Sequence, residues 1–214
     1  MKIGAIGDVH AEDGALAAAL AVLAHERADV ILAVGDIVDG PGDVDRCVAL
    51  LVEAGALAVR GNHDRWLVED KHRALGTQPG DLSAATRAFL AALPSTRTLA
   101  TPRGALVLCH GVGDDDMARL HADTAPDDLL HGADELDALL ADPDVAVVVG
   151  GHTHRRLVRR LARPDGAPAL LWLNPGTLKR DDDPCFALFD LERGVARFWD
   201  LLDGRPVFAS EGAL

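Results

Sequence analysis

Cysteine is scarce in this sequence, and the few cysteines present are not spaced as pairs. The 214 residues contain Cys47, Cys109 and Cys185, and no two of them form a C-x-x-C motif. An odd number without paired spacing excludes a disulfide framework and a cysteine-rich zinc site. We therefore expect buried, reduced thiols and a cytoplasmic protein.

Long apolar runs are also missing. No stretch of 18 apolar residues is present, which excludes an apolar membrane-spanning helix. The first residues, M-K-I-G-A-I-G-D, lead directly into a strand rather than into a signal segment. Apolar residues make up 49% and charged residues 26% of the chain, a soluble globular balance. With no linker or internal repeat, we expect one domain over residues 1–214.

Positive charge is in deficit. The chain has 34 acidic and 21 basic residues and a formal net charge of −13. This disfavours a nucleic-acid surface, because phosphate backbones are held by clustered Lys and Arg. The densest basic stretch, residues 155–163, holds five arginines. It is either a solvated edge strand or a rim that attracts an anionic substrate.

The order of expected elements changes along the chain. Strands alternate with helices over the first 62 residues, which predicts right-handed crossovers and a largely parallel sheet. The later strands look antiparallel, with a hairpin around E-R-G at 192–194. An insert at 65–93 is expected to form two helical pieces, the second capped by Ser83. Strands are expected at 2–6, 30–34, 57–60, 105–109, 145–149, 157–162, 169–173, 185–191 and 195–201, and helices at 13–26, 44–54 and 126–140, the last with Thr124 and Pro126 as start signals.

Chemically active side chains follow five of these strands. The motifs D-x-H, G-D-x-x-D, G-N-H-D, H-G and G-H-T-H stand there, each beside a glycine. Each one alone is ordinary turn or loop chemistry. Because sites in open α/β sheets form at the carboxyl ends of the strands, the five together predict one shared site. Its candidates are Asp8, His10, Asp36, Asp39, Asn62, His63, Asp64, His110, His152 and His154.

In this order the motifs resemble those of the calcineurin-like metallophosphoesterases, in particular the small single-domain bacterial and archaeal phosphodiesterases and phosphatases. The resemblance extends from Asp8 to the N-P-G-T turn at 174–177. It implies a mixed α/β fold, a four-layer α/β/β/α sandwich in which two mixed sheets pack face to face with helices outside. It also implies metal-dependent hydrolysis of phosphate mono- or diesters by a hydroxide held between two ions.

The resemblance also implies a role for each motif residue. One ion would be held by Asp8, His10 and His154, and a second by Asn62, His110 and His152, with Asp36 bridging them. His63 would protonate the leaving group without binding metal, and Asp39 would orient it. Nitrogen and oxygen ligands suit borderline transition ions, Mn²⁺ first, then Fe²⁺, Ni²⁺, Co²⁺ or Zn²⁺. Two such ions, roughly 3.5–4 Å apart, can neutralise the phosphate oxygens.

The sequence departs from part of the family pattern. The protein Ser/Thr phosphatases of this superfamily usually carry a phosphate-binding arginine where this chain has Gly40. Phosphate anchoring would then fall to Arg60, Asn62 or Arg155. The acidic run Asp114–Asp116 is expected to be an exposed helix start rather than a third metal site. Trp66 is either a packing residue or a platform for an aromatic leaving group.

Several functions stay open at this point. The leading hypothesis is a phosphoesterase with a small phosphorylated substrate; a hydrolase of dinucleoside polyphosphates or other nucleotides is a narrower alternative. A non-catalytic protein-binding scaffold, as in the retromer subunit of this fold, is disfavoured because every expected ligand type is present. A DNA-repair nuclease is disfavoured by the acidic charge. No membrane partner is expected, and a homo-oligomer stays open.

Overall fold

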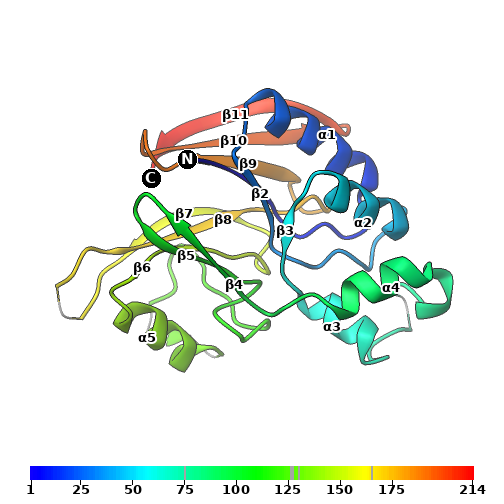
Figure 1. Cartoon of the computed structure of the whole chain (residues 1–214), viewed down its shortest axis with the longest axis horizontal. Coiled ribbons are helices and arrows are strands. Elements are labelled where there is room, and N and C mark those ends of the chain that lie inside the picture. The colour runs from blue at the N-terminus through cyan, green and yellow to red at the C-terminus, as the bar shows by residue number, and fades with distance from the viewer. Residues whose placement is uncertain (75, 126–127, 130, 165) are drawn as a thin grey trace.

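Two β-sheets lie face to face in the computed structural model, which describes all residues except 75, 126, 127, 130 and 165 (Figure 1). The strand order is β11-β10-β9-β1-β2-β3 in the first sheet and β4-β5-β6-β8-β7 in the second. The strands are β1 Lys2–Ile6, β2 Val30–Ala33, β3 Leu57–Ala58, β4 Arg97–Thr101, β5 Gly104–Leu108, β6 Val145–Val149, β7 Arg156–Leu161, β8 Leu170–Pro175, β9 Cys185–Asp190, β10 Val195–Leu202 and β11 Arg205–Ala213.

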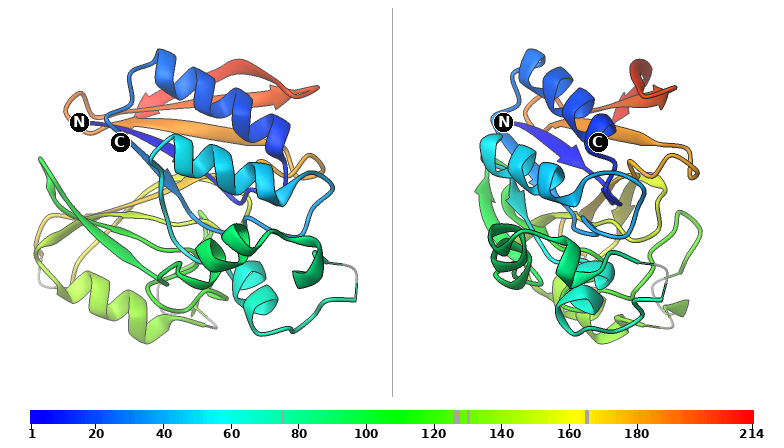
Figure 2. Two further views of the ribbon diagram at one scale, coloured as in Figure 1. Left: turned by 45° about the vertical axis from the view of Figure 1, so that its right-hand side comes forward. Right: turned by 90° about the vertical axis from the view of Figure 1, so that its right-hand side faces the viewer.

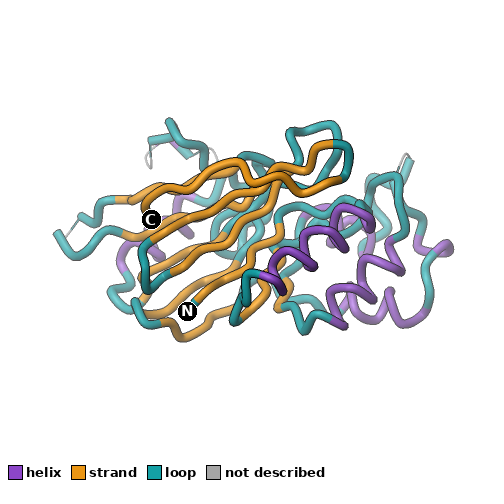
Figure 3. Tube along the Cα trace, turned by 90° about the horizontal axis from the view of Figure 1, so that it is seen from above, coloured by secondary structure: helices purple, strands orange, loops and turns teal. Residues whose placement is uncertain are grey.

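Helices cover the outer sides of this pair of sheets. They are α1 Asp13–His25, α2 Val44–Glu53, α3 Asn62–Val68, α4 Ala84–Ala91 and α5 Ala133–Ala141, with a short 3-10 helix at Pro79–Asp81. Helices α1 and α2 lie against the first sheet and α5 against the second (Figures 1 and 2). Seen from above, most of the helices gather at one side of the strands (Figure 3). The predicted four-layer sandwich is confirmed.

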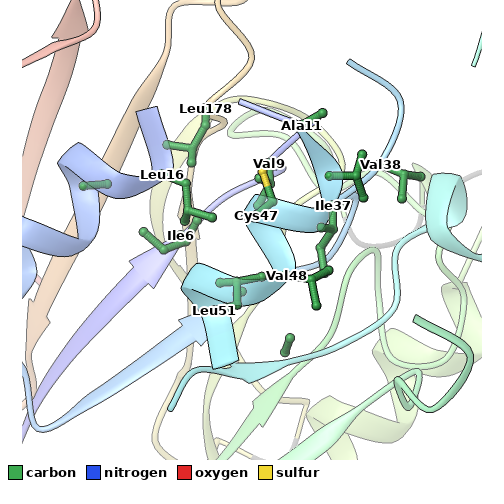
Figure 4. Packing of buried hydrophobic residues seen from close by; sticks show 14 of the residues in the cluster. Ile6, Val9, Ala11, Leu16, Ile37, Val38, Cys47, Val48, Leu51 and Leu178 are labelled. Atoms are coloured by element: carbon green, nitrogen blue, oxygen red, sulfur yellow. The ribbon is translucent and has the colours of Figure 1, made fainter. Parts of the chain in front are cut away.

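The central strands are buried on both faces. Ile3 and Ala5 of β1 pack into the apolar layer between the sheets, whereas Ile6 packs under α1 and α2. Figure 4 shows Ile6 beside Leu16 of α1, with Cys47 of α2 in the same cluster. Strands that are covered on both sides need no polar face, which explains why their sequences do not alternate. The three cysteines are buried with free thiols, as predicted.

Strand directions after Val149 follow the prediction in part. Strands β7 and β8 pair antiparallel, as do β9 and β10, but β8 also pairs in parallel with β6. Since β6 is parallel to β5 as well, the second sheet is mixed, as the resemblance implied. The hairpin between β9 and β10 is confirmed. The parallel pairs matter for the site, because they bring the carboxyl ends of β5 and β6 to one edge.

Two strands were not predicted, β4 and β11, and both are edge strands. Most β11 residues are exposed, and β4 is half exposed, so neither shows a buried apolar pattern. They are held by backbone pairing with β5 and β10. Residues 156–161 of the arginine-rich stretch form β7, also an edge strand, which supports the solvated-edge interpretation for this part, whereas Arg163 is buried.

The sequence predicted where helices occur more accurately than the residues at which they begin. Ser83 caps α4 as predicted, its side chain accepting a hydrogen bond from the Thr86 N–H. Helix α3 begins inside the G-N-H-D motif at Asn62, earlier than the predicted insert. Helix α5 begins at Ala133 after Gly132, whose left-handed backbone (φ 73°) ends the preceding loop. The predicted start at residue 126 lies outside the described residues. Among the described helices, none is long and apolar enough to cross a membrane.

Candidate metal centre and active site

The five motifs meet at one edge of the two sheets. Asp8, Asp36 and Asn62 follow β1, β2 and β3, which run parallel in the first sheet. His110 and the His152–His154 loop follow β5 and β6, which run parallel in the second. The structure therefore brings side chains from both sheets into a single cleft between their strand ends, as predicted from the sequence.

Four side chains form the first donor cluster, and their ligand atoms all lie within 4.8 Å of one another: Asp8, His10, Asp36 and His154. His10 Nε2 is 3.1 Å from His154 Nε2 and 3.8 Å from Asp36 Oδ2. His154 Nε2 is 3.6 Å from Asp8 Oδ1. Three of the four side chains are buried.

A second donor cluster shares Asp36 with the first. It consists of Asp36, His110 and His152. His110 Nε2 lies 3.4 Å from Asp36 Oδ2 and 3.0 Å from Asn62 Oδ1. The amide oxygen of Asn62 is thus next to this cluster as well. The two overlapping groups correspond to the two ligand sets that the resemblance implied.

The imidazoles are oriented by hydrogen bonds on their far side. His10 Nδ1 donates to the Asp39 carbonyl at 3.1 Å, and His110 Nδ1 donates to the Val34 carbonyl at 2.8 Å. His154 Nδ1 donates to Asp182 Oδ2 at 2.8 Å. For neutral His10 and His154, a proton fixed on Nδ1 leaves the Nε2 lone pair directed into the cluster, as in histidine ligands of metal proteins.

This arrangement is incomplete without a cation. The Nε2 atoms of His10 and His154 present lone pairs to each other at 3.1 Å. Asp8 Oδ2 is buried and has no hydrogen-bond partner among the described residues. Buried lone pairs that are neither bonded nor neutralised are costly. The donor set therefore fits divalent ions with a preference for nitrogen and oxygen ligands.

The ionisation of the cluster reflects its buried carboxylates: burial would lower the pKa of His110, but Asp36 and Asp8 outweigh it and raise the pKa to about 10. Burial would raise the pKa of Asp36, but the adjacent His110 outweighs this and holds it well below its ordinary value. Burial lowers the pKa of His152 to about 4, helped by the charge of His110. A neutral imidazole is the form that binds metal. In this structure His152 Nε2 accepts a hydrogen bond from Arg119 Nε at 3.1 Å.

Strained backbone concentrates at the site. Eleven described residues other than glycine have positive φ, and five of them belong to the motifs. They are His10 (46°), Asp36 (49°), Asp39 (65°), His152 (63°) and His154 (57°). Such conformations cost of order 1–3 kcal/mol each and persist where the surrounding contacts impose them. Here they aim side chains from tight loops into one cleft.

The N-P-G-T turn holds two of these loops together. Asn174 Nδ2 donates to the Gly151 carbonyl at 2.9 Å, next to the His152–His154 loop. Thr177 Oγ1 donates to the Asp8 carbonyl at 2.9 Å. A Cβ at Gly7 would lie 1.8 Å from the Gly176 carbonyl oxygen, so the two turns touch through their backbones. The turn thereby fixes the distance between Asp8 and the histidine pair.

His63 stands beside the clusters and does not belong to either of them. Its Nδ1 donates to Asp39 Oδ2 at 2.7 Å, and its side chain is 30% exposed in the cleft. Burial would lower the pKa of His63, but the hydrogen bond to Asp39 and the charge of Asp36 outweigh it and raise the pKa. Asp39 thus favours the protonated imidazole, the form that an acid requires.

Gly40 has a steric explanation. A Cβ at this position would lie 1.6 Å from the His10 carbonyl oxygen. The backbone after Asp39 packs directly on the D-x-H loop, so no side chain fits there. The arginine of the protein phosphatases is therefore excluded from this position by packing.

The residues predicted to bind substrate do not all reach the cleft. Asn62 and Arg155 line it. Arg60 is not among the described residues that line the cleft, and its buried Nε has no hydrogen-bond partner among the described residues. A substrate-binding role for Arg60 stays a prediction.

The acidic run was also misassigned. Residues 113–116 lie in turns and not at a helix start. Asp116 accepts two hydrogen bonds from Arg65, from Nε at 2.6 Å and from Nη2 at 2.8 Å. The run therefore anchors α3 to the loop after His110.

Three residues near the site were missed from the sequence. Arg73 binds Asp39, Asp182 binds His154, and Arg119 binds His152. They stand in loops with no motif, far along the chain from the residues they contact. Only the spatial contact identifies them. Trp66, in contrast, does line the cleft, its ring centroid 4.9 Å from that of His63.

A family model for the calcineurin-like phosphoesterase superfamily domain matches residues 1–194. The chain belongs to this superfamily. The prediction of a metal-dependent phosphoesterase is thereby confirmed at the level of the family. Solved structures agree on the fold: YfcE, a phosphoesterase from E. coli, is 19% identical, covers 100% of this chain and 99% of its own, and has a TM-score of 0.58.

Other structural neighbours are equally distant in sequence. A metallophosphoesterase from Sphaerobacter thermophilus is 22% identical, with a TM-score of 0.62 over 94% of this chain and 87% of its own. A Vps29 variant from Entamoeba histolytica is 18% identical, with a TM-score of 0.59 over 100% and 99%. At these identities the likeness shows the fold alone. Sequence comparison with curated proteins finds no match.

Proposed function

We propose that this phosphoesterase hydrolyses a small phosphate ester with two divalent transition-metal ions. The observation that carries the proposal is the pair of donor clusters that share Asp36. Asp8, His10 and His154 would hold one ion, and Asn62, His110 and His152 the other. Mn²⁺ is our first choice, because the donors are imidazole nitrogens and carboxylate or amide oxygens.

The bound ions would supply Lewis acidity toward the phosphate oxygens and an activated water nucleophile near neutral pH. The side chains of this protein would do the rest. Asp36 lies between the two ligand sets and would offset the mutual repulsion of two cations. The buried carboxylate of Asp8 would add negative charge on one side only, which makes the two positions chemically unequal.

His63 would protonate the departing alkoxide. It is exposed to the cleft, oriented through Nδ1 by Asp39, and close to the clusters without being part of them: its ring centroid is 5.0 Å from that of His10. Proton donation by a positioned side chain contributes typically about 10²–10⁴-fold in rate. Asp39 is the residue that sets the direction of that proton.

The cleft suits a small anionic substrate. Its volume is about 350 Å³, and Arg119 and Arg155 stand on its wall. Arg155 is 67% exposed and pairs with Asp183 on the rim, so it can turn toward a phosphate at little cost. Arg119, also exposed, is hydrogen-bonded to His152 and would contact a phosphate near that side chain.

A nucleotide substrate is the second candidate, favoured by Trp66. This half-buried indole lines the same cleft as Asn62 and His63. An aromatic leaving group next to His63 could stack there. A strong preference for nucleotide esters over simple aryl esters would support this narrower function, and equal rates would exclude it.

The test is hydrolysis of bis(p-nitrophenyl) phosphate and p-nitrophenyl phosphate after chelation and after Mn²⁺ is added back. We expect activity only with metal, and about two ions per chain by elemental analysis. The ratio of the two rates identifies diesterase or monoesterase. Two bound ions without hydrolysis of any ester would refute the proposed reaction, whereas a single bound ion would refute its dinuclear form.

A further inference from the structure

Arg73 lies in the connection between α3 and α4 and is nearly inaccessible to solvent. Its side chain is 8% exposed, although it carries a charge. Its guanidinium meets Asp39 with two parallel bonds, Nη1 to Oδ1 at 2.8 Å and Nη2 to Oδ2 at 2.9 Å. This fork geometry is specific to arginine and fixes both the position and the plane of a carboxylate.

Thr77, in the same connection between α3 and α4, also hydrogen-bonds to Asp39. The Thr77 N–H donates to Oδ1 at 2.7 Å, and the Asp39 N–H donates to Thr77 Oγ1 at 3.0 Å. With His63 Nδ1 on Oδ2, the carboxylate accepts four hydrogen bonds, about as many as its lone pairs allow. It has no freedom to rotate away from His63.

Two further contacts show that the connection between α3 and α4 packs closely against Asp39. A Cβ on Gly76 would lie 2.5 Å from Asp39 Oδ1, so the backbone passes directly against the carboxylate. Arg73 itself is held by Nε donating to the Lys71 carbonyl at 2.6 Å and by Nη1 donating to the Thr77 carbonyl at 3.1 Å.

We infer that Arg73 is a positioning residue for the reaction: it locks Asp39 so that His63 presents its Nε2 proton to the leaving group. Arg73 acts only through Asp39 and His63. The inference rests on the proposed function of His63 as the acid. The connection between α3 and α4 thereby contributes to the reaction, although none of its described residues lines the cleft.

The first test compares esters that need the acid to different degrees. The variant Arg73→Met is assayed on p-nitrophenyl and phenyl esters of the type that the unmodified enzyme prefers. Phenolate is the more basic leaving group and depends more on protonation. We expect kcat for the phenyl ester to fall about tenfold further than for the p-nitrophenyl ester. KM should change less than about threefold, and Arg73→Lys should recover part of the loss.

Arg163 offers a matched control. It is also largely inaccessible, with 7% of the residue exposed, but its guanidinium binds backbone carbonyls of Leu139, Asp142 and Pro168, beside α5. Arg163→Met should lower stability and leave the ratio between the two esters unchanged. An equal loss on both esters in Arg73→Met, or a changed ratio in Arg163→Met, overturns the inference.

A second test does not depend on activity. The ¹⁵N signals of the His63 ring, recorded on Zn²⁺-loaded protein, report whether Nδ1 carries the proton bonded to Asp39. We expect these signals to change in Arg73→Met and, to a smaller extent, in Thr77→Val. If Arg73→Met does not fold, Thr77→Val provides the test instead. Unchanged signals overturn the inference. Changed signals without hydrolysis by the unmodified enzyme would refute the proposed function and leave the positioning of His63 by Arg73 standing.

Discussion

Single side chains at this site divide into those that would hold metal and those that would move a proton. The division follows from contacts: six side chains form the two donor clusters, and His63 hydrogen-bonds outward to Asp39. A substitution should therefore affect either metal content or the chemical step. The two effects can be measured separately on the same sample.

His63→Asn should keep the metal and lose turnover. Asparagine cannot donate a proton as an acid, so kcat should fall about 10²–10⁴-fold. Elemental analysis and steady-state kinetics on the same preparation check this. A variant that binds less metal than the unmodified enzyme would show that His63 is a ligand.

Asp39 should contribute to stability in a pH-dependent way. Burial would raise its pKa, but the hydrogen bonds from His63 and Arg73 and from the Thr77 backbone lower it to about 2, below the ordinary 3.8. The folded state therefore binds this proton less tightly than the unfolded chain. The stabilisation is fully present above pH 3.8 and is lost as the pH falls through about 2.

The measurement is urea unfolding of the unmodified protein and Asp39→Asn. At neutral pH the variant should be less stable by about 2 kcal/mol at most. The difference should shrink as the pH is lowered below 4. A difference that is constant across this range would mean that the charge of Asp39 is not what stabilises the fold.

At the scale of elements, close backbone packing helps to fix the loops after the strands. Gly40 and Gly14 make this testable, because both are glycines near the D-x-H loop in very different surroundings. A Cβ at Gly40 would lie 1.6 Å from the His10 carbonyl oxygen, whereas a Cβ at Gly14, in α1, meets nothing within 4 Å.

The two Gly→Ala variants should have opposite effects. Gly40→Ala must push the G-D-x-x-D loop away from His10, and we expect a loss of roughly 1–3 kcal/mol together with lower activity. Gly14→Ala should raise the free energy of unfolding by about 0.5–1 kcal/mol, since alanine is the better helix former. Denaturation with urea measures both. Equal effects would contradict the packing shown at Gly40.

Across the whole molecule, the candidate metal centre joins the two sheets. Asp8, His10 and Asp36 come from loops of the first sheet, and His110, His152 and His154 from loops of the second. Bound ions would therefore stabilise the packing of the sheets as well as the site. Ligands that bind only the folded state raise its stability in proportion to the logarithm of their concentration.

Chelation should lower the melting temperature of the unmodified protein. At free metal about 100-fold above its Kd, one site contributes about 2.7 kcal/mol. Asp36→Asn weakens both clusters, so its melting temperature should hardly respond to the chelator. Scanning calorimetry with and without Mn²⁺ checks this. A chelator shift in Asp36→Asn as large as in the unmodified protein would exclude Asp36 as the shared ligand.

The sequence alone predicted the parts of this protein that are encoded locally. Apolar runs of four to six residues indicated the buried strands, and the D-x-H, G-D-x-x-D, G-N-H-D, H-G and G-H-T-H motifs indicated the candidate ligands. These signals are readable because strand and ligand are consecutive in the chain, and parallel strands bring their carboxyl ends together.

Only the tertiary structure decided the features that depend on contacts between distant residues. Arg73 meets Asp39 across 34 positions, and Arg119 meets His152 across 33, with no motif at either arginine. The edge strands β4 and β11 are held by backbone pairing, which leaves no apolar pattern in their sequence. In the sequence, Gly40 stands where the protein phosphatases carry a phosphate-binding arginine. In the structure, the carbonyl of His10, thirty residues earlier, leaves no room for a side chain at this position. Local patterns determine which groups the chain offers; long-range packing determines what each group touches.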